Sequence, residues 1–135
     1  PDAGAVARSQ AFSRELNLPL VTMDKHRDLS TGQVSFSKFT GDVIGKHLIS
    51  FDDFISTGST SIACAKILKD KGALSYTQCI THALLADSAV QNLQVSLIDR
   101  VLTTDSYPVP ASKRFAKLTI LPIAPLIAKT LTHLL

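Results

Sequence analysis

Short apolar runs alternate with helical segments along this chain, and the alternation limits the folds open to it. Apolar runs bounded by turn-forming residues predict strands at 18–23, 33–39, 47–51, 74–81, 97–103 and 118–123. Helical spacing of apolar residues predicts helices at 3–16, 60–71, 87–93 and 125–135. Strands alternating with helices in this way form a mainly parallel sheet with helices on both faces. The sequence therefore predicts a three-layer α/β fold.

The composition fits one folded domain. A chain of 135 residues is long enough to bury a core without a metal or disulfides. Its 45% apolar and 19% charged residues exclude a disordered tail. Cys64 and Cys79 show no ligand spacing, so we expect them in the core and expect no structural zinc.

The charge pattern and hydropathy bear on partners and location. A net charge of +3 spread along the chain predicts a solvated surface rather than a nucleic-acid interface. The chain shows neither a signal peptide nor an apolar run of transmembrane length. We therefore expect no nucleic-acid or membrane partner, and a cytoplasmic location by default.

An acidic pair follows the predicted strand at 47–51. Asp52 and Asp53 are thus expected at the carboxyl end of that strand, where ligands bind in parallel sheets. Two adjacent carboxylates need an electropositive neighbour. A divalent cation together with sugar hydroxyls is the simplest solution, because Mg²⁺ prefers oxygen ligands.

A run of small hydroxyl residues comes next and opens the predicted helix. The run consists of Ser56, Thr57, Gly58, Ser59 and Thr60. Backbone N–H groups at such a helix start form an anion site that suits a phosphate. The alternative is that the acidic pair and the hydroxyls only cap the helix, with Ser59 or Thr60 as the cap. The two features together favour a ligand with a diol at one end and a phosphate at the other.

A polar stretch at 24–32 is dense in charges and turn formers, which predicts a mobile loop. Its composition alone favours a solvated loop, with no catalytic role for Lys25 or Arg27.

The segment 51–60 resembles the phosphoribosyl-pyrophosphate (PRPP) motif of phosphoribosyltransferases, in which a strand, two acidic residues and a Thr-Gly-x-Thr loop follow one another. The whole chain resembles the C-terminal half of the ribose-phosphate pyrophosphokinase (PRPP synthetase) family. Further segments similar to that family, in order, are 1–4, 24–27, 41–46, 81–85 and 103–108.

The resemblance implies a phosphoribosyltransferase-like fold and a role for each matching residue. Asp52 and Asp53 bind the ribose 2- and 3-hydroxyls, directly or through Mg²⁺, and Asp2 lies near the metal and the ribose. Lys25 and Arg27 are catalytic cations that close over the transferring phosphates. The residues implied to hold the 5-phosphate are Ser56, Thr57, Gly58, Ser59 and Thr60.

Several positions depart from the family pattern. Ser56 stands where many members have Asp, Ser59 replaces a small residue, and Ser50 interrupts the apolar strand. His26 stands where a basic residue is usual, and His82 fits a structural role better than a site wall. The departures are compatible with a standard synthetase or with a divergent paralogue.

The implied activity is transfer of a diphosphoryl group from ATP to the 1-hydroxyl of ribose 5-phosphate. In that family the ATP-binding residues lie mostly in an N-terminal half, which this chain lacks. We therefore interpret 1–135 as a C-terminal domain that binds ribose 5-phosphate or PRPP with Mg²⁺ but does not turn over alone. The start at Pro1, without Met, predicts a piece of a longer protein, with trimming or processing as alternatives.

The family also implies self-association into a homo-oligomer. Two other functions stay open. One is a PRPP-dependent phosphoribosyltransferase, for which the sequence offers no base-recognition segment. The other is a non-catalytic, synthetase-associated protein that binds ribose phosphates.

Overall fold

The computed structural model describes residues 3–27 and 34–134, which contain a four-stranded parallel sheet and a separate hairpin. The parallel sheet has the order β3-β4-β5-β6. Its strands are β3 (His47–Ile55), β4 (Ser75–Ala83), β5 (Arg100–Thr104) and β6 (Leu118–Leu121). The hairpin pairs β1 (Thr22–Arg27) with β2 (Val34–Thr40) in antiparallel fashion. The prediction of an α/β fold around a mainly parallel sheet is confirmed.

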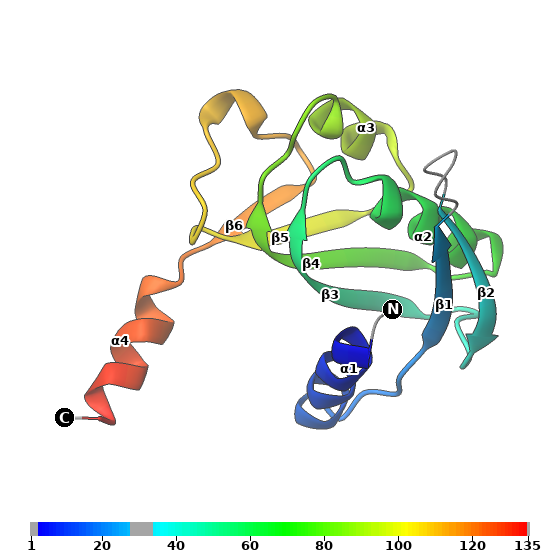
Figure 1. The fold of residues 1–135 in the computed structure, drawn as a ribbon, viewed down its shortest axis with the longest axis horizontal. Helices are drawn as coiled ribbons and strands as arrows, with labels where there is room; N and C mark the ends of the chain where they lie inside the picture. Colours follow the sequence, from blue (N-terminus) through cyan, green and yellow to red (C-terminus); the bar gives the residue numbers. More distant parts are fainter. Residues whose placement is uncertain (1–2, 28–33, 135) are drawn as a thin grey trace.

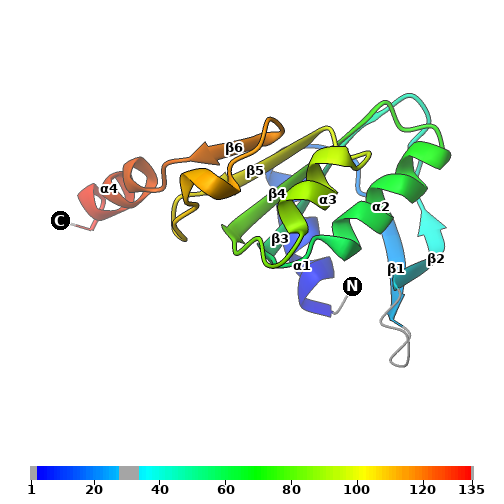
Figure 2. The ribbon, with the colours of Figure 1, turned by 90° about the horizontal axis from the view of Figure 1, so that it is seen from above.

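Helices flank both faces of this sheet. Helices α2 (Ser59–Asp70) and α3 (Ala89–Val95) cover one face, and α1 (Ala3–Glu15) lies on the other (Figures 1 and 2). The rings of Phe12 in α1 and Phe51 in β3 stack with their centroids 3.8 Å apart. A short 3-10 helix, η1 (Ala111–Lys113), precedes β6, and α4 (Ala124–Thr132) projects beyond the sheet without buried residues (Figure 1). Within the described ranges, every helix is too short or too polar to span a bilayer.

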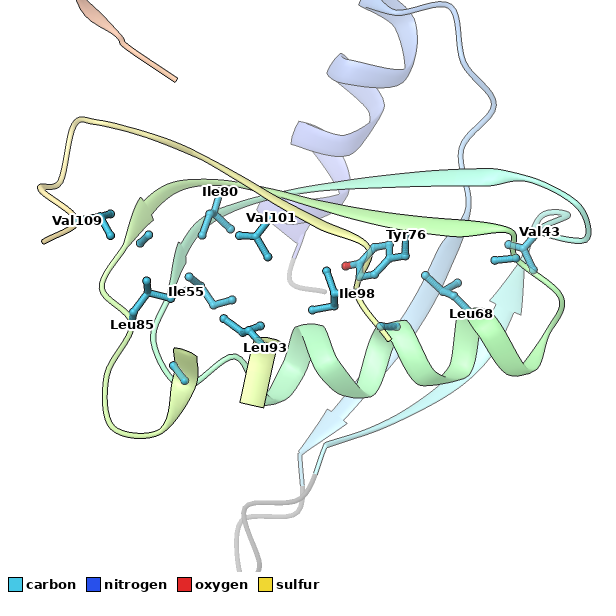
Figure 3. Packing of buried hydrophobic residues seen from close by; sticks show 14 residues of the cluster. Val43, Ile55, Leu68, Tyr76, Ile80, Leu85, Leu93, Ile98, Val101 and Val109 are labelled. Atoms are coloured by element: carbon cyan, nitrogen blue, oxygen red, sulfur yellow. The ribbon is translucent and has the colours of Figure 1, made fainter. Parts of the chain in front are cut away.

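The core fills the space between the sheet and α2. Figure 3 shows Leu68, Leu93 and Ile98 in this layer. Along β4, the side chains of Tyr76, Gln78 and Ile80 are buried, whereas the residues between them are only partly buried. Successive side chains of a strand point to opposite faces, so this alternation shows which face of β4 packs against the helices.

Helix α2 ends as the sequence predicts. Gly72 has a φ of +92°, which glycine adopts without the steric cost of a Cβ atom. The N–H of Gly72 donates to the carbonyl of Lys69 at 2.9 Å, and that of Ala73 donates to the carbonyl of Leu68 at 3.0 Å. This pair of bonds is a Schellman motif, which satisfies the last carbonyls of the helix.

The predicted strand at 18–23 and the predicted loop at 24–32 are wrong in part. The strand begins only at Thr22, because Pro19 lacks an N–H and Asn17 turns the chain with a φ of +51°. It then continues to Arg27, because its backbone pairs with β2, and this pairing outweighs the polar composition. Residues 28–33 lie outside the described part of the chain.

The predicted strand at 47–51 is too short. It continues to Ile55 because β4 pairs with it beyond the acidic pair, matching Asp52 with Ile80 and Phe54 with His82. The two aspartates therefore lie within the strand, not after it.

Gly58 lies immediately before α2 with a φ of +80°. A Cβ atom there would come within 3.0 Å of the side chain of buried Leu93. We expect Gly58→Ala to lower the free energy of unfolding by about 2 kcal/mol, through the left-handed backbone and the contact with Leu93. Urea denaturation measures the change.

Gly45→Ala is the matched control, because Gly45 has a φ of +66° and no atom of the described residues lies within 4 Å of the position that a Cβ atom would take. It should cost only the backbone contribution of about 1 kcal/mol. Equal losses in the two variants would contradict the contact with Leu93.

Candidate functional site

A pocket of about 180 Å³ lies at the carboxyl end of β3 and the start of α2. Its position agrees with the rule that parallel sheets bind ligands beyond the carboxyl ends of their strands. It contains every residue predicted to hold the phosphate. The lining residues are Asp52, Phe54, Ile55, Ser56, Thr57, Gly58, Ser59, Thr60 and Ser61.

Backbone N–H groups at the start of α2 are available to a ligand in this pocket. The first bond of the helix runs from the N–H of Ile62 to the carbonyl of Gly58, at 2.9 Å. N–H groups in a first helical turn have no acceptor inside their own helix. The predicted cap by Ser59 or Thr60 is wrong, because Gly58 takes the cap position and has no side chain to accept a bond. The N–H groups that follow Gly58 thus have the arrangement that an anion site requires.

Hydroxyl groups supplement these amides. The hydroxyl of Thr57 donates to Oγ of Ser59 at 3.3 Å, and its own oxygen lies 3.5 Å from the N–H of Ser59. Hydroxyls that both donate and accept can bind phosphate oxygens.

The start of the loop is fixed by the segment after β4. The carbonyl of Ile55 accepts a bond from the N–H of Leu84 at 3.0 Å, and that of Ser56 accepts one from the N–H of Ala86 at 3.1 Å. Ile55 and Leu85 are both buried, so this junction is held by packing as well. The loop therefore starts from a rigid part of the fold.

The structure places the two aspartates on opposite faces of β3. Asp52 lines the pocket, whereas Asp53 lies on the face covered by α1. This follows from their position inside the strand, where successive side chains alternate. The N–H of Asp53 donates to Oδ1 of Asp52 at 2.9 Å, so the backbone at Asp53 helps to orient the carboxylate of Asp52.

Asp53 forms an ion pair with Arg8, which donates from α1 to Oδ1 of the carboxylate. The side chain of Asp53 is 63% exposed and that of Arg8 is 35% exposed. Asp53 is therefore accessible from solvent but already has a cationic partner.

A buried polar cluster of Ser50, Tyr76 and Gln78 lies on the same face of the sheet as Asp52. The hydroxyl of Tyr76 donates to Oε1 of Gln78 at 2.6 Å, and Oγ of Ser50 lies 2.7 Å from that hydroxyl. Burial, with smaller contributions from Cys64 and Asp52, raises the pKa of Tyr76 well above its usual range, so the phenol stays neutral. Ser50, which interrupts the apolar strand, takes part in this cluster.

The burial of Cys64 and Cys79 and the contacts of His82 fit structural roles for these residues. Cys64 and Cys79 are half-buried free thiols, and burial raises the pKa of both. Nδ1 of His82 lies 2.9 Å from the hydroxyl of Ser106, which agrees with the structural role favoured by the sequence. Ser106 in turn donates to the carbonyl of Thr81 at 3.2 Å, so this contact joins the ends of β4 and β5.

A larger cavity of about 430 Å³ lies beside β3, between that strand, α1 and the segment that follows α1. Its lining is mostly apolar. Among the described residues that line it, Asp42 carries the one carboxylate, which accepts a bond from the N–H of Ile44 at 3.0 Å. The hydroxyl residues of this cavity are spread over α1, β3 and β4, and they are Ser9, Ser13, Ser50 and Tyr76. Those of the smaller pocket follow one another at a helix start, so the smaller pocket is the better match to a phosphate.

The two predicted catalytic residues, Lys25 and Arg27, lie in β1. The backbone of Lys25 pairs with Phe36 and that of Arg27 with Val34, within the hairpin. Their side chains and the whole of Asp2 lie outside the described part of the structure.

The donor set can be compared with the needs of Mg²⁺. Asp52 and the hydroxyl loop offer hard oxygen atoms, which suit a cation that takes one or two carboxylates plus substrate oxygens and water. Within residues 3–27 and 34–134, no three His, Cys, Asp or Glu side chains gather as a cage. The site therefore fits an Mg²⁺ ion held by Asp52 and by oxygen atoms of a sugar phosphate. Mg²⁺ would there neutralise the negative charge of the phosphate.

The sequence interpretation missed two residues near the site. Ser61 lines the pocket and continues the hydroxyl run, so the run itself could have indicated it. Arg8 gave no signal, because its contact with Asp53 joins residues 45 positions apart.

Comparisons with known proteins agree with these observations. A ribose-phosphate pyrophosphokinase of Nostoc sp. is 39% identical over 132 residues, which cover 97% of this chain and 40% of that protein. Ribose-phosphate pyrophosphokinase 2, chloroplastic, of Oryza sativa is 37% identical over 98% of this chain and 33% of its own length. The crystal structure of phosphoribosylpyrophosphate synthetase from Mycobacterium smegmatis matches with a TM-score of 0.80 and 34% identity, covering 98% of this chain and 42% of that one.

The chain thus spans less than half the length of each of these relatives, and the predicted resemblance to PRPP synthetases is confirmed. A family model described as the phosphoribosyl synthetase-associated domain matches residues 3–134. The chain therefore belongs to the phosphoribosyl synthetase-associated domain family.

Proposed function

We propose that this chain binds ribose 5-phosphate or PRPP, with the 5-phosphate in the pocket at the start of α2. The observation that carries the proposal is the pocket itself, which joins the carboxylate of Asp52 to the hydroxyl loop and the helix start. A phosphate accepts bonds from the amides and hydroxyls, and the helix dipole favours its negative charge. The residues proposed to hold it are Ser56, Thr57, Gly58, Ser59 and Thr60.

The acidic pair is proposed to bind the ribose diol. Asp52 faces the pocket and can accept bonds from hydroxyls of a sugar whose phosphate lies in the loop. Asp53 is proposed to reach the diol or the cation from the neighbouring position, and Asp2 to lie near the same cation. Mg²⁺ is the proposed cofactor, because carboxylate and phosphate oxygens are its preferred ligands.

We further propose that the chain takes part in ribose-phosphate diphosphokinase activity. The named relatives are pyrophosphokinases, and this chain is proposed to supply their ribose 5-phosphate site. Lys25 and Arg27 are proposed to stabilise charge on the transferring phosphates, because phosphoryl transfer depends on positioning and cations. ATP, a homo-oligomer and a cytoplasmic setting belong to the same proposal.

A second candidate is a non-catalytic domain that binds a ribose phosphate within a synthetase assembly. The description of the matched family as synthetase-associated favours it. Lys25→Ala in a full-length protein distinguishes the two functions. If the protein is catalytic, this variant should lose turnover far more than substrate binding.

Isothermal titration calorimetry with ribose 5-phosphate and Mg²⁺ tests the site. We expect Asp52→Asn to weaken binding about tenfold or more, because a charged acceptor for the diol is lost. Asp70→Asn removes an equal charge from the far end of α2, where Asp70 pairs with Lys66, and should bind like the parent chain. Unchanged affinity in Asp52→Asn would contradict the proposed diol contact.

The chain alone should not make PRPP from ATP and ribose 5-phosphate. A coupled assay that consumes PRPP measures this directly, with a complete PRPP synthetase as the positive control. ATP-dependent PRPP formation by these 135 residues alone would show that the chain holds a whole active site.

A further inference from the structure

The ion pair between Arg8 and Asp53 bears on how the acidic pair meets a cation. We propose that Arg8 competes with divalent cations and sugar hydroxyls for the carboxylate of Asp53, and so weakens cation binding to the unliganded chain. Arg8 is then a positioning residue, which acts on the ligand through Asp53. The biological meaning of this inference rests on the proposed sugar-phosphate site.

Two contacts join one face of α1 to one face of β3. Arg8 and Phe12 lie one helical turn apart and share a face of α1. Phe51 and Asp53 are two residues apart in β3 and share the opposing face of the strand. Phe12 stacks on Phe51 while Arg8 binds Asp53. The stacked rings can therefore keep α1 in place when the ion pair opens.

The exposure of the pair makes this competition feasible. Asp53 is 63% exposed, so a cation or a hydroxyl can approach its carboxylate from solvent. An exposed ion pair contributes little free energy, and breaking it changes an equilibrium constant by at most about fivefold. Such a contact lowers the affinity of Asp53 for a cation without blocking it.

The backbone transmits the contact to Asp52. The N–H of Asp53 donates to Oδ1 of Asp52 at 2.9 Å, so the restraint on Asp53 also reaches the carboxylate in the pocket. With Arg8 in place, the charge of Asp53 is neutralised, so its carboxylate attracts a cation less strongly. A bound sugar phosphate adds further oxygen ligands, and these can offset the competition.

Binding of free Mn²⁺, without any sugar phosphate, tests the proposal. Mn²⁺ takes oxygen ligands as Mg²⁺ does, and water-proton relaxation follows its binding. We expect Arg8→Ala to raise the affinity of the chain for Mn²⁺ about two- to fivefold. Arg8→Lys keeps a cation at this position and should stay close to the parent value.

Arg14→Ala is the matched control. Arg14 lies on the same helix and carries the same charge, but it donates to the carbonyl of Gln10 rather than to a carboxylate. It should leave Mn²⁺ affinity nearly unchanged, which separates the contact from the general effect of removing one positive charge. Adding Asp53→Asn to Arg8→Ala should abolish the gain.

Unchanged or weaker Mn²⁺ binding in Arg8→Ala would overturn the proposal, as would an equal gain in Arg8→Lys or Arg14→Ala. A merely structural role for Arg8 predicts a loss, not a gain. Circular dichroism checks folding, and Arg8→Gln replaces Arg8→Ala if the latter does not fold. Failure of the parent chain to bind ribose 5-phosphate is a separate result that counts against the proposed function alone.

Discussion

The parallel pairing of β3 with β4 is the constraint on which the candidate site depends. It carries β3 past the acidic pair to Ile55, so the phosphate loop starts from a buried and paired residue. It also fixes which aspartate faces the loop, because alternation along a paired strand leaves no freedom in this choice. The start of α2, with Gly58 in a left-handed conformation, then places amides and hydroxyls opposite Asp52. The pocket and the position of Asp52 thus both result from one strand, β3, and the turn that follows it.

The local parts of this arrangement could be predicted from the sequence. The strand, the hydroxyl loop, the helix and its end at Gly72 depend on short-range patterns, and their order alone implies a parallel sheet. The separation of Asp52 from Asp53 could not be predicted, because it depends on where β4 stops pairing with β3. The contact of Arg8 with Asp53 joins two elements distant in sequence and leaves no periodic signal. The strand at Lys25 could not be predicted for a similar reason, because this polar segment forms a strand only through its pairing with β2.

Ser50 shows how a departure from a family pattern can have a structural cause. In the sequence alone it only interrupts an apolar strand. In the fold it bonds with Tyr76 and Gln78, two buried polar residues that would otherwise lose a partner. The cluster lies on the face that carries Asp52, so it supports the strand beneath the proposed site. Ser50, Tyr76 and Gln78 are therefore part of the framework of that site and not evidence against it.

The central claim is that the phosphate of a ribose phosphate binds at the start of α2. Two-dimensional ¹H–¹⁵N NMR of the chain, titrated with ribose 5-phosphate and Mg²⁺, tests it most directly. The account predicts the largest shifts at the amides of Thr57, Gly58, Ser59 and Thr60, with smaller shifts at Asp52 and Asp53. Shifts confined to the larger cavity beside α1, around Leu16 and Ile49, with the loop amides unmoved, would contradict it.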